Sequence, residues 1–129
     1  MNAKDMITFY YPYSGLDWLN YQIKDMENFT DITYHHIIPR REHSKKDMQN
    51  GALLVAVSHQ YLHLIEQMEI DTFDDLNKIL KDINTQKREP YQYQREDIEE
   101  ILQDFEGRHK WEKNKEGVLL IKKKYLKRW

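Results

Sequence analysis

The chain contains no cysteine among its 129 residues. Disulfides and thiolate metal sites are therefore excluded, so any metal ion must be held by histidine, carboxylate or amide oxygen. Glycine and proline are also scarce, with four and three residues, and the scattered glycines form no phosphate-binding loop. No window approaches 18 consecutive apolar residues, and residues 1–13 lack the features of a secretion signal. We expect a soluble, cytoplasmic protein with no membrane partner.

Composition and charge predict one globular domain with an uneven charge distribution. Hydrophobic residues make up 40% of the chain and charged residues 33%, a balance typical of a folded domain over residues 1–129. Residues 66–106 hold thirteen acidic and five basic residues, whereas residues 108–129 hold nine basic and two acidic residues. The basic tail could follow a polyanion or pair with the chain's own acidic helices.

The first third of the chain predicts an extended segment, a helix and a strand. Residues 9–13 are aromatic and contain Pro12, which favours an edge strand or an extended segment. From Ser14 to about Glu27 apolar residues recur at helical spacing, with Trp18 and Tyr21 expected in the core or at its rim. Residues 31–38 are β-branched and aromatic and predict a strand that ends at Pro39.

The remainder predicts a second strand and several helices, giving an α+β fold. Residues 40–50 read as a loop, Asn50-Gly51 as a turn, and residues 52–57 as a buried strand. Ser58 is placed to cap a helix from His59, and further helices are expected at about 72–83 and 96–105, the last capped by Gly107. Residues 118–121 could form a short strand or open a basic helix. The expected core therefore spans 31–70, between an N-terminal helical segment at 1–30 and a helical and basic extension at 71–129.

Five of the six histidines fall between His35 and His63. On the predicted helix, His59, His63 and Glu66 lie on the face opposite the apolar stripe, so these histidines are not core residues. Taken alone, that group could be an ordinary polar helix face, and His43 a solvated loop residue. Together the histidines form an ordered pattern: His35-His36-Ile37-Ile38-Pro39, then Asn50 fourteen positions after His36, then His59 nine positions after Asn50.

This pattern resembles the HNH, or ββα-metal, nuclease family over about residues 31–66. The resemblance implies a strand-loop-strand-helix core, DNA as substrate and one divalent ion, which could be Mg, Mn, Ni or Zn. By position, His36 matches the general base and Asn50 the residue that orients it. His35, His59 and His63 match the metal ligands of a histidine-rich subset. Val55 and Ser58 stand where many members carry the cysteines of a structural zinc site.

Two features of the loop and strand bear on this assignment. Four cations of the loop offer a surface for backbone phosphates, or else a solvated run of charge: Arg40, Arg41, Lys45 and Lys46. On an ideal strand His35 and His36 point to opposite faces. The assignment therefore predicts that the strand bends or ends just before Pro39, so that ligand and base can approach one phosphate.

Other functions are open at this level. A non-catalytic binding or inhibitor module could use the same scaffold and contact a protein partner through its acidic surface at 66–106. A purely structural zinc held by the histidines is a third possibility, in which chelation would unfold the protein.

Overall fold

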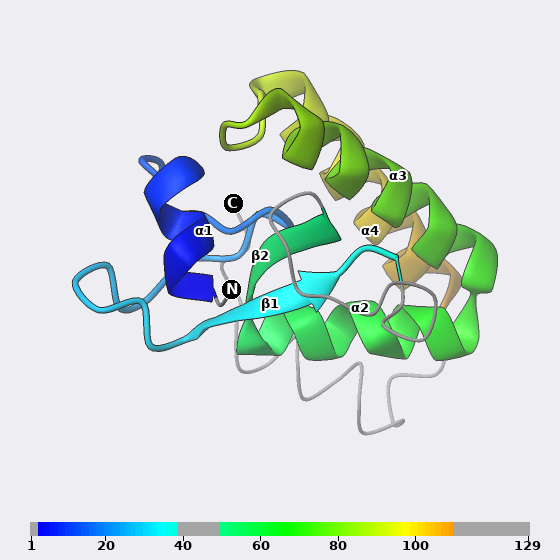
Figure 1. Cartoon of the computed structure of the whole chain (residues 1–129). Helices are drawn as coiled ribbons and strands as arrows, with labels where there is room; N and C mark the ends of the chain where they lie inside the picture. The colour runs from blue at the N-terminus through cyan, green and yellow to red at the C-terminus, as the bar shows by residue number, and fades with distance from the viewer. Residues whose placement is uncertain (1–2, 39–49, 110–129) are drawn as a thin grey trace.

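The computed structural model describes residues 3–38 and 50–109 and shows a mixed α+β fold. A two-stranded antiparallel sheet lies at the centre, with helices packed around it (Figure 1). The elements in chain order are α1 (Ala3–Phe9), β1 (Ile32–His36), β2 (Gly51–Val55), α2 (Ala56–Met68), α3 (Ile70–Gln86) and α4 (Gln92–Arg108). Within the described residues, none of the helices combines the length and apolar character needed to cross a membrane.

The two strands pair from Ile32 opposite Val55 to His36 opposite Gly51. All five residues of β2 are buried, as the continuous apolar run predicts. Gly51 is required by packing, because a Cβ atom there would lie 2.5 Å from the Tyr34 ring and 2.6 Å from the Met6 sulfur. The small residue lets α1 approach one face of the sheet, while α2 and α3 pack against the sheet as well.

Helices α2, α3 and α4 confirm the three predicted helices, with different ends. α2 begins at Ala56 with Val55 as its N-cap, so the prediction that Ser58 caps the helix is wrong. Ser58 is instead buried in the first turn, where its hydroxyl donates to the Asp17 carboxylate. Gly107 also lies inside α4, whose C-cap is His109.

The N-terminal third differs most from the sequence prediction. Helix α1 extends to Phe9, inside the segment expected to be extended. Residues 14–27 form turns rather than a helix, with an isolated bridge between Leu16 and Gln22 and a left-handed Asn20 at φ 71°. Trp18 and Tyr21 are nevertheless buried in the core, as expected.

Asp17 is the physical reason that this segment is not helical. Its buried carboxylate accepts hydrogen bonds from the backbone N–H of Leu19 at 2.8 Å and of Tyr21 at 2.9 Å. Its other oxygen accepts from the Val55 N–H at 2.9 Å and from the Ser58 hydroxyl. A turn that satisfies these donors holds the segment against the junction of β2 and α2.

The Asp17 turn is also joined to α4 by a buried arginine. One guanidinium nitrogen of Arg95 donates to the Asp17 carbonyl and to the Asn20 side chain, each at 3.0 Å. The Asn20 amide returns a hydrogen bond to the Arg95 carbonyl at 2.9 Å. Burial raises the pKa of Asp17 to about 6, although its four hydrogen bonds oppose that shift. That value is still below neutral pH, so the carboxylate is mainly ionised there, and it interacts electrostatically with the Arg95 cation.

We expect Asp17→Asn to lower the free energy of unfolding by about 2–4 kcal/mol, because an amide has one acceptor oxygen in place of two, so at least one of the backbone N–H groups of Leu19, Tyr21 and Val55 would face an amide nitrogen and lose its acceptor. Urea unfolding followed by circular dichroism measures the change. Asp82→Asn, an exposed substitution on α3, is the matched control and should stay within about 0.5 kcal/mol of wild type. Equal stability of Asp17→Asn and wild type would contradict the role assigned to this carboxylate.

Candidate metal centre

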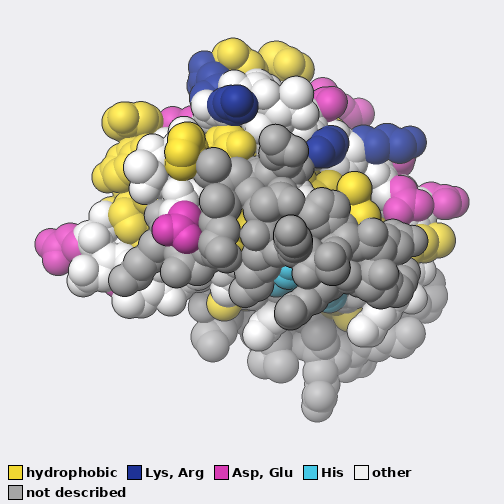
Figure 2. Space-filling view, in the orientation of Figure 1, with side chains coloured by type: hydrophobic (Ala, Val, Ile, Leu, Met, Phe, Trp, Pro, Cys, Tyr) yellow, Lys and Arg dark blue, Asp and Glu magenta, His cyan; other side chains and the backbone are white. Residues whose placement is uncertain are grey.

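Three histidines from two elements converge beside the sheet. His35 projects from β1, and His59 and His63 project from successive turns of α2. One potential ligand atom of each lies within 4.8 Å of those of the other two. The ring centroid of His35 is 5.3 Å from that of His59 and 5.7 Å from that of His63. Histidine side chains are visible near the middle of the face drawn in Figure 2.

His35 is held by an asparagine of α3. Its Nε2 lies 3.0 Å from the Asn77 side-chain oxygen, an acceptor, so this ring nitrogen carries the proton. The Asn77 amide nitrogen donates to the Ile37 carbonyl at 3.2 Å, which fixes the orientation of the amide. The ring nitrogen of His35 left with a free lone pair is therefore Nδ1.

The two helix histidines are oriented in the same manner. The Thr33 hydroxyl donates its proton to the Leu54 carbonyl at 2.7 Å, so it must accept from His59 Nδ1 at 2.9 Å. His63 Nδ1 lies 3.1 Å from a Glu66 carboxylate oxygen, which can only accept. Both rings therefore present the lone pair of Nε2.

Each of the three rings thus has one nitrogen bound to a protein group and one nitrogen available to a ligand. This is how histidine ligands are oriented at metal centres, where the second ring nitrogen donates to a carboxylate, carbonyl or similar acceptor. On a polar helix face that bound no ligand, we would not expect three rings to converge with one nitrogen of each ring bound to a protein group. The residues present therefore fit a divalent ion held by three imidazoles.

Burial keeps two of the rings in the state that a metal requires. His35 is only 2% exposed, and burial lowers its pKa to about 3. Burial and then the neighbouring His63 lower the pKa of His59 to about 4. Both rings are therefore neutral at physiological pH. Between these pKa values and 6.5 the unfolded chain binds more protons than the folded one, so these two groups destabilise the fold at low pH and this destabilisation disappears as the pH rises through that range.

His36 lies on the other face of β1. Its ring centroid is 4.9 Å from that of Tyr34, two residues earlier on the same face. The strand does not bend between the two histidines, because His36 still pairs with Gly51 and the Ile37 N–H donates to the Asn50 carbonyl at 2.9 Å. The bend expected before Pro39 is therefore not found at His35 and His36; β1 ends after both of them.

Asn50 acts on the backbone that follows His36. Its side-chain oxygen accepts from the Ile38 N–H at 2.8 Å, and its amide nitrogen donates to the Ile38 carbonyl at 3.0 Å. This buried residue clamps the chain two residues after His36, at the point where the two strands separate. The loop cations predicted to contact phosphates lie outside the described residues, as does His43: Arg40, Arg41, Lys45 and Lys46.

Two of the groups that orient the histidines were not identified from the sequence. Thr33 could have been, because it lies two residues before His35 and so on the same face of the strand. Asn77 could not, since it belongs to α3 and is 42 residues from His35. Nothing in the local pattern of α3 distinguishes it from a solvated polar residue.

Comparisons of the chain with protein-family models, with curated proteins and with solved structures found no match.

We expect Asn77→Ala to weaken the binding of Zn²⁺ or Ni²⁺ by about 10- to 100-fold, the usual effect of removing a group that orients a histidine ligand. Isothermal titration calorimetry on protein freed of metal measures the affinity. Lys78→Ala, which removes the exposed neighbour on α3, should bind as wild type does. If Asn77→Ala also binds as wild type does, the ring of His35 is not held for a metal.

Proposed function

We propose that this protein is a metal-dependent endonuclease of the HNH type that hydrolyses phosphodiester bonds in DNA. The observation that carries the proposal is the convergence of His35, His59 and His63, each with its second ring nitrogen bound to a protein group. The order β1, β2, α2 is compatible with the ββα-metal core that the sequence resemblance implies.

The ligand set favours particular metals. Three imidazoles suit Zn²⁺ or Ni²⁺ better than Mg²⁺, which prefers oxygen ligands. When bound, such an ion would stabilise negative charge on the phosphoryl oxygens and on the departing oxygen, and three protein ligands leave coordination positions open to substrate. The protein's part is to hold the three rings neutral and in fixed orientations.

His36 is the proposed general base. A neutral imidazole can accept a proton from water at physiological pH. In an in-line displacement the attacking water and the departing oxygen lie on opposite sides of the phosphorus, so a base on one face of β1 and ligands on the other can act on the same phosphate. In the described residues the sheet has two strands, so β1 pairs with β2 along one of its two edges. At the other edge of β1 a phosphate could contact side chains from both faces of the strand. Asn50 supports this arrangement by fixing the backbone beyond His36.

We expect purified protein to cleave plasmid DNA when Zn²⁺, Ni²⁺ or Mn²⁺ is supplied, and His36→Ala to reduce the rate by about 100-fold or more, the contribution typical of a general base. His36→Ala should still bind metal, because His36 is not one of the ligands. His59→Ala should lose both metal binding and cleavage. Gel electrophoresis of the plasmid measures the rate, and calorimetry measures metal binding.

Two outcomes would contradict this proposal. The first is wild-type protein that binds metal but cleaves neither DNA nor RNA with any of these ions. The second is a His36→Ala variant that cleaves as fast as wild type, which would remove the assigned base. If chelation of the wild-type protein unfolds it and no cleavage is seen with metal present, the site is a structural zinc site instead.

A binding or inhibitor module is a second candidate, favoured by the acidic surface of α3 and α4. Figure 2 shows acidic side chains on both sides of the face drawn. The exposed acidic residues of the two helices are Asp71, Asp74, Asp75, Asp82, Glu96, Asp97, Glu100 and Asp104. Such a surface could contact a basic protein partner, and it would repel DNA that approached from that side.

The acidic surface can be tested separately from the histidines. We expect the triple variant Asp97→Asn, Glu99→Gln, Glu100→Gln to cleave DNA at least as fast as wild type, because fewer negative charges oppose the substrate. The plasmid assay at low and high salt measures this effect, which should shrink as salt screens the charges. A biological activity that survives replacement of His35, His36, His59 and His63 but disappears in the triple variant would favour the binding module.

A further inference from the structure

Exposed aromatic side chains are concentrated in one part of the molecule. Seven large hydrophobic residues are exposed among the described residues, and five of them are aromatic residues of two short segments: Phe9, Tyr11, Tyr13, Tyr91 and Tyr93. Tyr13 is 83% exposed and Tyr93 is 63% exposed. The first segment follows α1, and the second opens α4. In Figure 2 hydrophobic and basic side chains lie next to one another at the top of the molecule, over the turn between α3 and α4.

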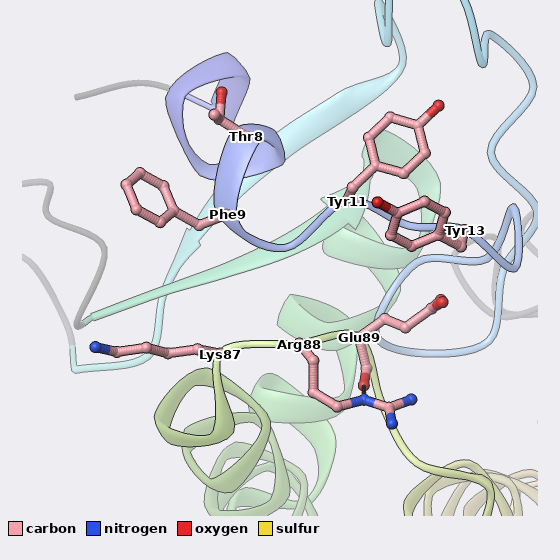
Figure 3. A pocket seen from close by; sticks show the side chains of 7 residues that line it. All are labelled: Thr8, Phe9, Tyr11, Tyr13, Lys87, Arg88 and Glu89. Atoms are coloured by element: carbon pink, nitrogen blue, oxygen red, sulfur yellow. Dashed lines mark hydrogen bonds between the residues drawn. The ribbon is translucent and has the colours of Figure 1, made fainter.

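A pocket of about 370 Å³ lies between the first of these segments and residues 87–89, which follow α3. One wall is formed by residues 8–13, with Thr8, Phe9, Tyr11 and Tyr13 lining it, and the other by residues 87–89. Figure 3 shows the two tyrosines side by side on one wall, across the pocket from Arg88 and Glu89. Their ring centroids are 4.7 Å apart. The pocket is thus bounded by aromatic rings on one side and by charged groups on the other.

The carboxylate of Glu89 carries the negative charge of the pocket, and it is hydrogen-bonded to other groups of the protein. One Glu89 carboxylate oxygen accepts from the Ser14 hydroxyl at 2.6 Å and from the Ser14 N–H at 3.2 Å. The same oxygen accepts from buried Arg95 at 3.3 Å. Since Glu89 is already paired with a buried cation, Lys87 and Arg88 set the electrostatic character of the rim.

A second aromatic surface continues from the pocket toward α4. The rings of Tyr91 and Tyr93 are stacked, with centroids 5.9 Å apart and planes at 10°. The Arg88 guanidinium carbon lies 3.9 Å from the centroid of the Tyr91 ring. A cation held against a tyrosine beside a second, parallel tyrosine offers both a flat apolar face and a positive charge.

We propose that this aromatic pocket binds unpaired nucleotides of a nucleic acid strand. Bases would stack on the exposed tyrosine rings, and the phosphates would be neutralised by Lys87 and Arg88. Combined aromatic faces and cations are the usual means of holding single-stranded nucleic acid, because every base has a face that can stack and every nucleotide carries a negative charge. Burial in an apolar protein interface is a poorer match, since four of the five exposed rings are tyrosines with a polar hydroxyl and two cations border them.

The pocket is connected to the metal centre by α3. Asn77 contacts His35, and Lys87 follows the last residue of the same helix ten residues later. A helix rises about 1.5 Å per residue, so these positions are roughly 15 Å apart along the helix axis. A strand held in the pocket could therefore extend to the metal centre over a few nucleotides. This link to cleavage rests on the proposed function, whereas binding in the pocket does not.

The test measures binding with metal removed, so that it is independent of catalysis. Fluorescence anisotropy in EDTA is recorded with a labelled 15-nucleotide oligo(dU), the same length of oligo(U), and a duplex of mixed sequence. We expect wild type to prefer the single strands to the duplex at low salt. The double variant Tyr13→Ala, Tyr93→Ala should bind the single strands at least tenfold more weakly, because base–aromatic stacking is lost. The better of the two single strands identifies the sugar.

Matched variants separate stacking from other effects of the substitutions. Tyr13→Phe with Tyr93→Phe keeps the rings and should bind as wild type does. Ile70→Ala removes an exposed apolar side chain elsewhere and should also bind as wild type does. Lys87→Gln with Arg88→Gln should weaken binding of both single strands and reduce its salt dependence. Thermal unfolding confirms that each variant is folded.

Several results would overturn the proposal. Wild type could fail to bind any single strand, or the double alanine variant could bind single strands as tightly as wild type. The double alanine variant could lose as much affinity for the duplex as for the single strands, which would mean that unpaired bases are not recognised. Alternatively, light scattering could show that wild type is a dimer and that the alanine variant is a monomer with unchanged nucleic acid binding, which would assign the surface to a second copy of the chain. If wild type does not cleave nucleic acid but its binding of single strands still depends on the tyrosine rings, only the nuclease proposal is overturned.

Discussion

The buried carboxylate of Asp17 is the interaction on which the arrangement of this protein depends. It accepts hydrogen bonds from its own turn, from Val55 at the end of β2 and from Ser58 in the first turn of α2. Arg95 joins the same turn to α4. His59 follows Ser58 directly, so the contact that holds the N-terminal segment lies next to the first histidine of α2 in the candidate metal centre. A single buried charge, compensated by four hydrogen bonds and a nearby cation, thus connects the outer segments to the site.

The candidate metal centre is assembled from β1, α2 and α3. Its three histidine rings are held in fixed orientations by side chains that bind one nitrogen of each ring. Asn77, Thr33 and Glu66 each occupy one nitrogen of a different histidine, and one potential ligand atom of each ring lies within 4.8 Å of those of the other two. Strand alternation then separates His36 from this set, so that His35 and His36 occupy different faces of β1. That separation, which looked like an obstacle in the sequence, is compatible with a reaction whose nucleophile and leaving group lie on opposite sides of phosphorus.

Helix α3 contributes to both the candidate metal centre and the aromatic pocket. Asn77 contacts His35 in the candidate metal centre, and residues 87–89 at the end of the helix form one wall of the pocket, whose other wall comes from residues 8–13. The exposed acidic residues of α3 and α4 would repel a polyanion that approached from their side. In the proposed function, cleavage and recognition of the substrate are therefore divided between the hairpin-helix unit and the segments that surround it.

The sequence by itself determined the features that depend on neighbouring residues. The β-branched run at 31–38, the apolar run at 52–57 and the apolar periodicity of three helices were sufficient to predict β1, β2, α2, α3 and α4. The spacing of His59 and His63 likewise placed both rings on one helix face.

Tertiary structure decided what depends on distant partners. Residues 14–27 have a helical apolar pattern but form turns, because Asp17 binds groups 38 and 41 residues away. Asn77 reaches His35 across 42 residues, and the aromatic pocket joins residues 8–13 to 87–89. Periodicity reports which face of a segment is apolar, whereas these contacts arise only when folding brings separate segments together and buried polar groups must find partners.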